Sequence, residues 1–162
     1  MKNKLHIFLL VLISFACNAQ VTEKLSPFVL IVQPILVSSD QGTDPASMAL
    51  PENLVDNAYS KAGVDFHFLE PIYFNNTNAR DGLINLDSIV KLAYKEGYIK
   101  GQNDMVNMFF VNAIDGDKGP LGRGMMGGNL TFISLGNDTG EENINMQAFV
   151  IAKNMVHTIH QV

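Results

Sequence analysis

The apolar run at residues 28–37, FVLIVQPILV, constrains the fold of this chain more than any other segment. A strand with one face in water alternates apolar and polar side chains, whereas this run is interrupted only by Gln33 and Pro34. Such a run is typical of a strand covered on both faces, as in an α/β sheet. Pro34 cannot donate a ladder hydrogen bond, so it predicts a bulge or an edge position.

Helix and strand patterns alternate along the rest of the chain. Helices are expected at residues 51–63, at 85–98 and from about Asn145, and further strands at 64–74, 104–114 and 129–135. The order strand, helix, strand, helix, strand, strand, helix predicts an α/β fold. We expect a mixed, twisted sheet of about four strands, with crossover helices and a final helix at the end of the sequence.

Two of these segments carry finer expectations. The pattern of the helix at 51–63 places four apolar side chains inward: Leu54, Val55, Ala58 and Tyr59. In the strand at 64–74, His67 alternates with apolar neighbours and is expected on the solvent side.

The length of 162 residues is enough for one domain with its own core. Lys2 and Lys4 precede a short apolar stretch and small residues before Gln20, which predicts a signal peptide at 1–19 and a domain at 20–162. The apolar stretch is too short to span a membrane. Lipid attachment at Cys17 is the alternative, and either route predicts a secreted or periplasmic protein of bacterial type.

Charge and cysteine content narrow the possible partners. Residues 1–19 contain two lysines and no acid, so their removal would change the formal net charge from −5 to −7. A chain this acidic is a poor match for nucleic acid or an anionic membrane surface. Cys17 is the only cysteine, which leaves residues 20–162 with neither a disulfide nor a cysteine zinc site.

Residues 149–162, FVIAKNMVHTIHQV, have the pattern of an amphipathic helix. Lys153, His157 and His160 recur at spacings of four and three, which places them on one stripe of a helix. The neighbouring apolar stripe consists of Phe149, Ala152, Val156 and Ile159. One face is therefore expected to pack, and the face beside it to present nitrogen atoms.

The pattern can be compared with HExxH, in which two imidazoles hold zinc and the carboxylate between them acts as general base. Residues 153–157 read Lys-Asn-Met-Val-His at the corresponding places. A lysine ammonium must lose its proton before it can bind a metal, and the amide of Asn154 cannot serve as a general base. Only His157 keeps the residue type of the motif.

On these residues the chain resembles the N-terminal part of a metzincin-type zinc metallopeptidase domain of the pappalysin-like kind. Val-Ile-Ala at 150–152 and His-Thr-Ile at 157–159 match the context of HExxHxxGxxH. His160 stands at the glycine, and the sequence stops one residue before the third histidine, so the motif is degenerate and truncated. The resemblance implies a zincin-like fold and zinc, with Asn154 at the base position and Lys153 at a ligand position.

Both histidines also have simpler interpretations. His157 is either a remaining zinc ligand or an ordinary polar residue near a helix end. His160 fits better as a cationic residue that complements the helix dipole.

The glycine-rich segment at 115–136 is a second candidate for function. Gly122, Gly124 and Gly127 spell GxGxxG, but a strand rather than a helix is expected next, so a dinucleotide loop is rejected. In the resembled peptidases an edge strand in this place pairs with extended substrate. That role would fall to four residues: Asn129, Leu130, Thr131 and Phe132. A glycine-rich surface connection without a ligand explains the composition equally well.

These observations lead to alternative hypotheses. The chain is a secreted zinc metallopeptidase-like protein that is catalytically impaired, a pseudoenzyme whose partner is a peptide or protein. Alternatively, it is a non-catalytic secreted peptide-binding or structural interaction module. A third interpretation is a truncated product. A protease descendant should place Lys153 and His157 at the floor of a cleft lined by residues 129–135.

Overall fold

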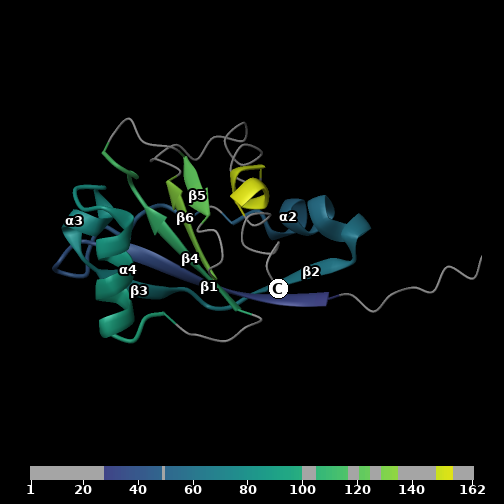
Figure 1. Cartoon of the computed structure of the whole chain (residues 1–162), viewed down its shortest axis with the longest axis horizontal. Helices are drawn as coiled ribbons and strands as arrows, with labels where there is room; N and C mark the ends of the chain where they lie inside the picture. Colours follow the sequence, from purple (N-terminus) through teal and green to yellow (C-terminus); the bar gives the residue numbers. More distant parts are fainter. Residues whose placement is uncertain are drawn as a thin grey trace, which may run out of the picture.

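The computed structural model describes residues 28–48, 50–99, 105–116, 121–124, 129–134 and 149–154 (Figure 1). Its strands are β1 (Phe28–Ser38), β2 (Val64–Phe68), β3 (Ile72–Asn75), β4 (Met105–Val111), β5 (Gly122–Gly124) and β6 (Leu130–Ser134). Its helices are α2 (Glu52–Tyr59), the 3-10 helix η2 (Ser60–Ala62), α3 (Thr77–Arg80) and α4 (Leu86–Lys95). Residues 149–154 are also helical.

The strands form one six-stranded sheet in the order β2-β1-β4-β6-β5, with β3 also paired to β1. All these pairings are parallel except that of β5, which runs antiparallel to β6. The expected α/β class is confirmed. Two more strands are present than the four expected, because residues 64–74 form two strands and the glycine-rich segment contains β5.

Two residues without an N–H, Pro34 of β1 and Pro71 in the gap itself, account for the division of residues 64–74. β1 is paired on both sides, so Pro34 does not lie at the edge of the sheet, which was one of its two expected positions. Its register partner in β4 is Met108. The Leu69 N–H donates to the Val32 carbonyl oxygen, so every second residue of β1, including Pro34, turns its backbone toward β2 and β3. The neighbouring strand is interrupted beside the missing N–H, and the buried Gln33 side chain donates there to the Glu70 carbonyl oxygen at 2.9 Å.

The sheet is covered on both faces, as the apolar run of β1 requires. On one face, Leu30, Val32 and Leu36 of β1 pack in a cluster with Val55 of α2 and with Val150 and Ile151. On the other face, Ile35 and Val37 pack with Ile89 and Ala93 of α4. The cluster on the α4 face also contains Ala79 of α3. The α2 face therefore also carries residues 149–154, and α3 and α4 lie on the opposite face (Figure 1).

Local sequence signals account for where the helices begin and end, but the buried face of α2 differs from the predicted one. The side chain of Asn85 caps α4 by accepting from the Ser88 N–H, and Gly63, with a φ of 69°, ends η2 after α2. In α2 only Val55 is buried and Tyr59 is half-buried, whereas Leu54 and Ala58 are exposed, so the predicted inward face was too wide. His67 is exposed on β2, as expected.

Within the described ranges, none of the helices has the length and apolar character that crossing a membrane requires. The expected signal peptide at residues 1–19 and the alternative lipid site at Cys17 lie outside the described residues.

Candidate functional site

The predicted site helix lies against the end of the sheet formed by β5 and β6 (Figure 1). Val150 and Ile151 are buried, 7% and 0% exposed, in the same cluster as Ile133 of β6. Phe149 is 62% exposed and Ala152 is half-exposed, although both were expected to pack. The inward face is therefore rotated relative to the predicted one, because the sheet meets the side of the helix that carries Val150 and Asn154.

Asn154 is the site residue that the structure places most firmly. Its Oδ1 accepts a hydrogen bond from the Gly124 N–H of β5 at 2.9 Å, and its Nδ2 donates to the Val150 carbonyl oxygen at 2.8 Å. The residue is only 8% exposed. The carboxamide is thus oriented at both ends, and it joins residues 149–154 to the backbone of β5.

Gly122 allows this close approach. A Cβ atom at this position would lie 2.4 Å from the Asn154 Nδ2 and 2.7 Å from the Val150 Cγ1. Both distances are well inside van der Waals contact, so any side chain would separate the helix from β5. Gly122 is therefore required by the packing of residues 149–154 against β5.

The predicted metal residues are placed only in part. Lys153 is exposed, while His157 and His160 lie outside the described residues. Nowhere in the described ranges do three or more His, Cys, Asp or Glu side chains gather as a metal site would require. With both ends of the Asn154 amide engaged, the described residues by themselves provide no zinc ligand set.

The strand expected at the edge of the sheet is an interior strand. β6 holds Leu130, Thr131 and Phe132, and it pairs with β4 on one side and β5 on the other. All five of its residues are buried. The edge-strand prediction for Asn129 to Phe132 is therefore wrong in position, because β5 pairs with β6 on the side away from β4. Among the described strands, β5 pairs only with β6.

A tyrosine holds the same helical segment from its other side. The Tyr59 hydroxyl at the end of α2 donates to the Ala152 carbonyl oxygen, and the ring packs edge-on against Phe66 with centroids 5.0 Å apart. Burial raises the pKa of Tyr59 above its ordinary value of 10.0. The segment is therefore fixed to α2 through Tyr59 and to β5 through Asn154.

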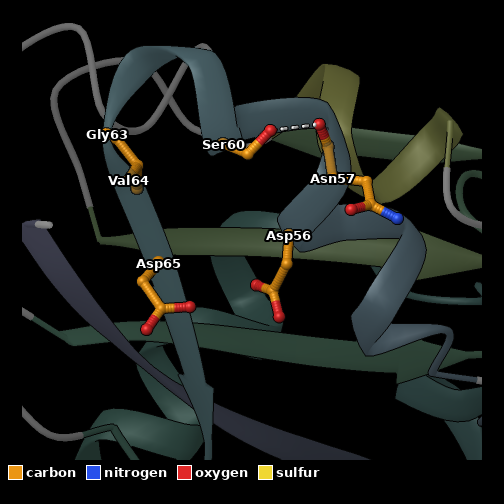
Figure 2. Close-up of a pocket in the computed structure, with 6 residues that line it drawn as sticks. All are labelled: Asp56, Asn57, Ser60, Gly63, Val64 and Asp65. Carbon is orange, nitrogen blue, oxygen red and sulfur yellow. Dashed lines mark hydrogen bonds between the residues drawn. The ribbon is translucent and has the colours of Figure 1, made fainter.

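A separate open hollow of about 260 Å³ lies between the end of α2 and the start of β2 (Figure 2). It is lined by Asp56, Asn57, Ser60, Gly63, Val64 and Asp65. The Asp56 and Asp65 carboxyl groups turn toward the space between the two elements (Figure 2). Asp56 accepts from the Phe66 N–H at 3.2 Å, so it joins α2 to β2, and none of the lining residues was predicted to be functional.

At the carboxyl ends of the parallel strands, where α/β proteins commonly bind ligands, this chain has a cluster of charged side chains that bind one another. The Arg80 guanidinium contacts Asp81 at 2.8 Å and Asp44 at 2.9 Å, and the Asn112 Nδ2 donates to Asp81 at 3.2 Å. The hydrogen bond from Arg80 lowers the pKa of Asp81, although burial opposes that shift. These partners tie together the segments that follow β1, β3 and β4.

Sequence reasoning identified Asn154 as an altered residue but missed its bond to β5. Two signals were available: the i, i+4 spacing of Val150 and Asn154, which places them on one face, and the alternation of Gly122 with Gly124. Neither signal predicts that the two segments contact each other, because Gly124 and Asn154 are separated by 30 residues.

No protein-family model matches this chain, and neither a curated protein nor a solved structure matches it. The resemblance to zinc peptidases therefore stays a hypothesis.

Proposed function

We propose that this chain is a secreted, non-catalytic relative of the zinc metallopeptidases that binds extended peptide segments along β5. The observation that carries the proposal is the hydrogen bond between Asn154 and Gly124. It brings the segment with the degenerate motif beside a strand at one end of the sheet. A peptidase lineage requires this adjacency, because the reacting group must lie near the strand that holds the substrate.

The chemistry at positions 153 and 154 supports binding rather than cleavage. An amide lacks the basic oxygen that removes a proton from a water molecule, and the Asn154 amide is already engaged at both ends. Lys153 replaces an imidazole with an exposed ammonium group. Zinc stays part of the hypothesis only through His157.

The two edges of the sheet differ in how readily an extended peptide could pair with them. The outer strand at the other end is interrupted between β2 and β3, and it presents Asp65, His67 and Glu70. Charged side chains and interruptions are devices that discourage strand pairing. β5 consists of Gly122, Arg123 and Gly124, so it is uninterrupted and carries one charged side chain, although Val150 and Asn154 already cover Gly122 on one face of the sheet.

The test begins with a random library of fluorescein-labelled ten-residue peptides, from which the tightest binder to the purified protein is selected. Titration into the ¹⁵N-labelled protein should shift the amide signals of Gly122 and Gly124 and leave those of Asp65 and His67 unchanged. Shifts confined to β2, or no peptide with a measurable dissociation constant, would contradict the proposal.

The proposal that the chain is non-catalytic is tested by calorimetric titration with zinc and by a quenched-fluorescence peptide cleavage assay. We expect neither tight stoichiometric zinc binding nor cleavage from the unmodified protein. The comparison variant carries Lys153→His together with Asn154→Glu. Tight binding of one zinc ion by the unmodified chain would overturn the non-catalytic assignment.

A second candidate is a structural or interaction module with no peptide site. The burial of Asn154, which is 8% exposed, favours it, because an accidental likeness to the motif would be expected to pack that helix face. The same NMR titration separates the two candidates, since a module of this kind leaves the β5 amides unchanged.

A further inference from the structure

The register of β5 shows which of its backbone groups face away from the sheet. Gly122 lies opposite Ile133, Arg123 opposite Phe132, and Gly124 opposite Thr131. The Ser134 N–H donates to the Leu121 carbonyl oxygen at 2.8 Å, so that pair is hydrogen-bonded. Bonded and non-bonded pairs alternate in an antiparallel ladder. The Arg123 pair is then bonded, and the N–H and C=O groups of Gly122 and Gly124 point away from β6.

The pairing of β6 with β4 gives the same assignment independently. The Asn107 N–H of β4 donates to the Asn129 carbonyl oxygen at 2.7 Å, so Asn129 and every second residue after it turn their backbone toward β4. Phe132 and Ser134 consequently face β5. These two residues are the partners of Arg123 and Leu121 in the bonded pairs.

One of the outward donors of β5 already has an acceptor within the chain. The Gly124 N–H points to the side from which another strand would pair, and there it donates to the Asn154 Oδ1 at 2.9 Å. The second bond of the carboxamide, from Nδ2 to the Val150 carbonyl oxygen, holds the oxygen in this orientation. Asn154 thus occupies the place that the first carbonyl of an added strand would take at Gly124.

We infer that Asn154 acts as an internal cap on β5, and that it competes with an extended peptide for the Gly124 N–H. The inference rests on the proposed function for its ligand. Residues 122–124 offer few outward groups, so a peptide either displaces the Asn154 oxygen or binds with one hydrogen bond fewer. Position 154 then sets the affinity of the β5 edge, a role distinct from that of a lost general base.

The cap itself is measured without any peptide. Asn154→Ala removes the acceptor, and amide hydrogen exchange at Gly124 should accelerate about tenfold or more. Phe149→Ala is the control, because Phe149 is an exposed residue of the same helical segment and its truncation leaves the bond between Asn154 and Gly124 in place. Equal exchange at Gly124 in the unmodified protein and Asn154→Ala would show that the cap does not exist.

The competition is measured with the selected peptide. Freeing one hydrogen-bond donor should tighten binding to Asn154→Ala about three- to tenfold, while Phe149→Ala should bind like the unmodified protein. Faster exchange with unchanged affinity would refute the competition and leave peptide binding intact. Faster exchange with no binding by any variant would refute the proposed function while the cap itself stands.

If Asn154→Ala fails to fold, the unmodified protein still gives an answer. Saturation with the peptide should shift the side-chain amide signals of Asn154, because its oxygen loses the bond to Gly124. Binding at β5 that leaves those signals in place would overturn the competition.

Discussion

Gly122→Ala tests the packing of residues 149–154 against β5 with the smallest possible change. The new Cβ would meet the Asn154 Nδ2 at 2.4 Å and the Val150 Cγ1 at 2.7 Å. Overpacking of this kind costs about 1–3 kcal/mol, and loss of the bond to Gly124 adds about 0.5–1.5 kcal/mol. The lower backbone entropy of alanine in the unfolded chain offsets about 0.4–1 kcal/mol. The expected net loss in free energy of unfolding is about 2 kcal/mol, within a range of about 0.5–4 kcal/mol.

The assay is urea unfolding at 25 °C, followed by circular dichroism. Gly63→Ala is the comparison, because a Cβ at Gly63 meets nothing within 4 Å although its φ is 69°. It gives the cost of a left-handed backbone without overlap, about 1 kcal/mol, whereas Gly122, which has no positive φ, gives overlap without that backbone cost. The decisive measurement repeats Gly122→Ala in a protein that already carries Val150→Ala and Asn154→Ala. If the loss is as large there as in the unmodified protein, overlap with these two side chains is not its cause.

Two further outcomes follow from ionisable side chains. Because Arg80 holds the pKa of Asp81 below 3.8, this carboxylate stabilises the fold above that pH, and the contribution is lost as pH falls through the lowered value. Asp81→Asn should therefore flatten the acid limb of unfolding free energy below about pH 5, and an unchanged limb would contradict it. Burial raises the pKa of Tyr59, so its contribution is present below pH 10.0 and is lost as pH rises through the raised value. Tyr59→Phe should cost about 1 kcal/mol at pH 7 through the bond to Ala152, and should weaken the alkaline loss of stability; an identical alkaline limb would exclude Tyr59 as its source.

Much of the α/β fold could be predicted because its signals are local. The apolar run of β1 required cover on both faces, and the structure covers it with α2 on one face and α4 on the other. Asn85 and Gly63 marked helix ends through bonds and dihedral angles that involve only neighbouring residues. Such features depend on a few consecutive residues, so composition and periodicity suffice to predict them.

The candidate site was predicted less well, because its geometry depends on distant partners. The sequence drew attention to Asn154 and to the glycine-rich segment, but it placed the edge of the sheet in β6 and the packed helix face on Phe149 and Ala152. Only the fold placed β5 beside β6, at the end of the order of described strands. Only the fold turned Asn154 toward Gly124.

By itself, then, the sequence determined the periodicities, the helix ends and the need for a sheet buried on both faces. The tertiary structure decided which strand is last in the sheet, where the strand beside Pro34 breaks and what the amide of Asn154 binds. The physical reason is that a hydrogen bond across 30 residues is selected by the packing of the whole chain, whereas a capping bond is selected by the three residues it spans.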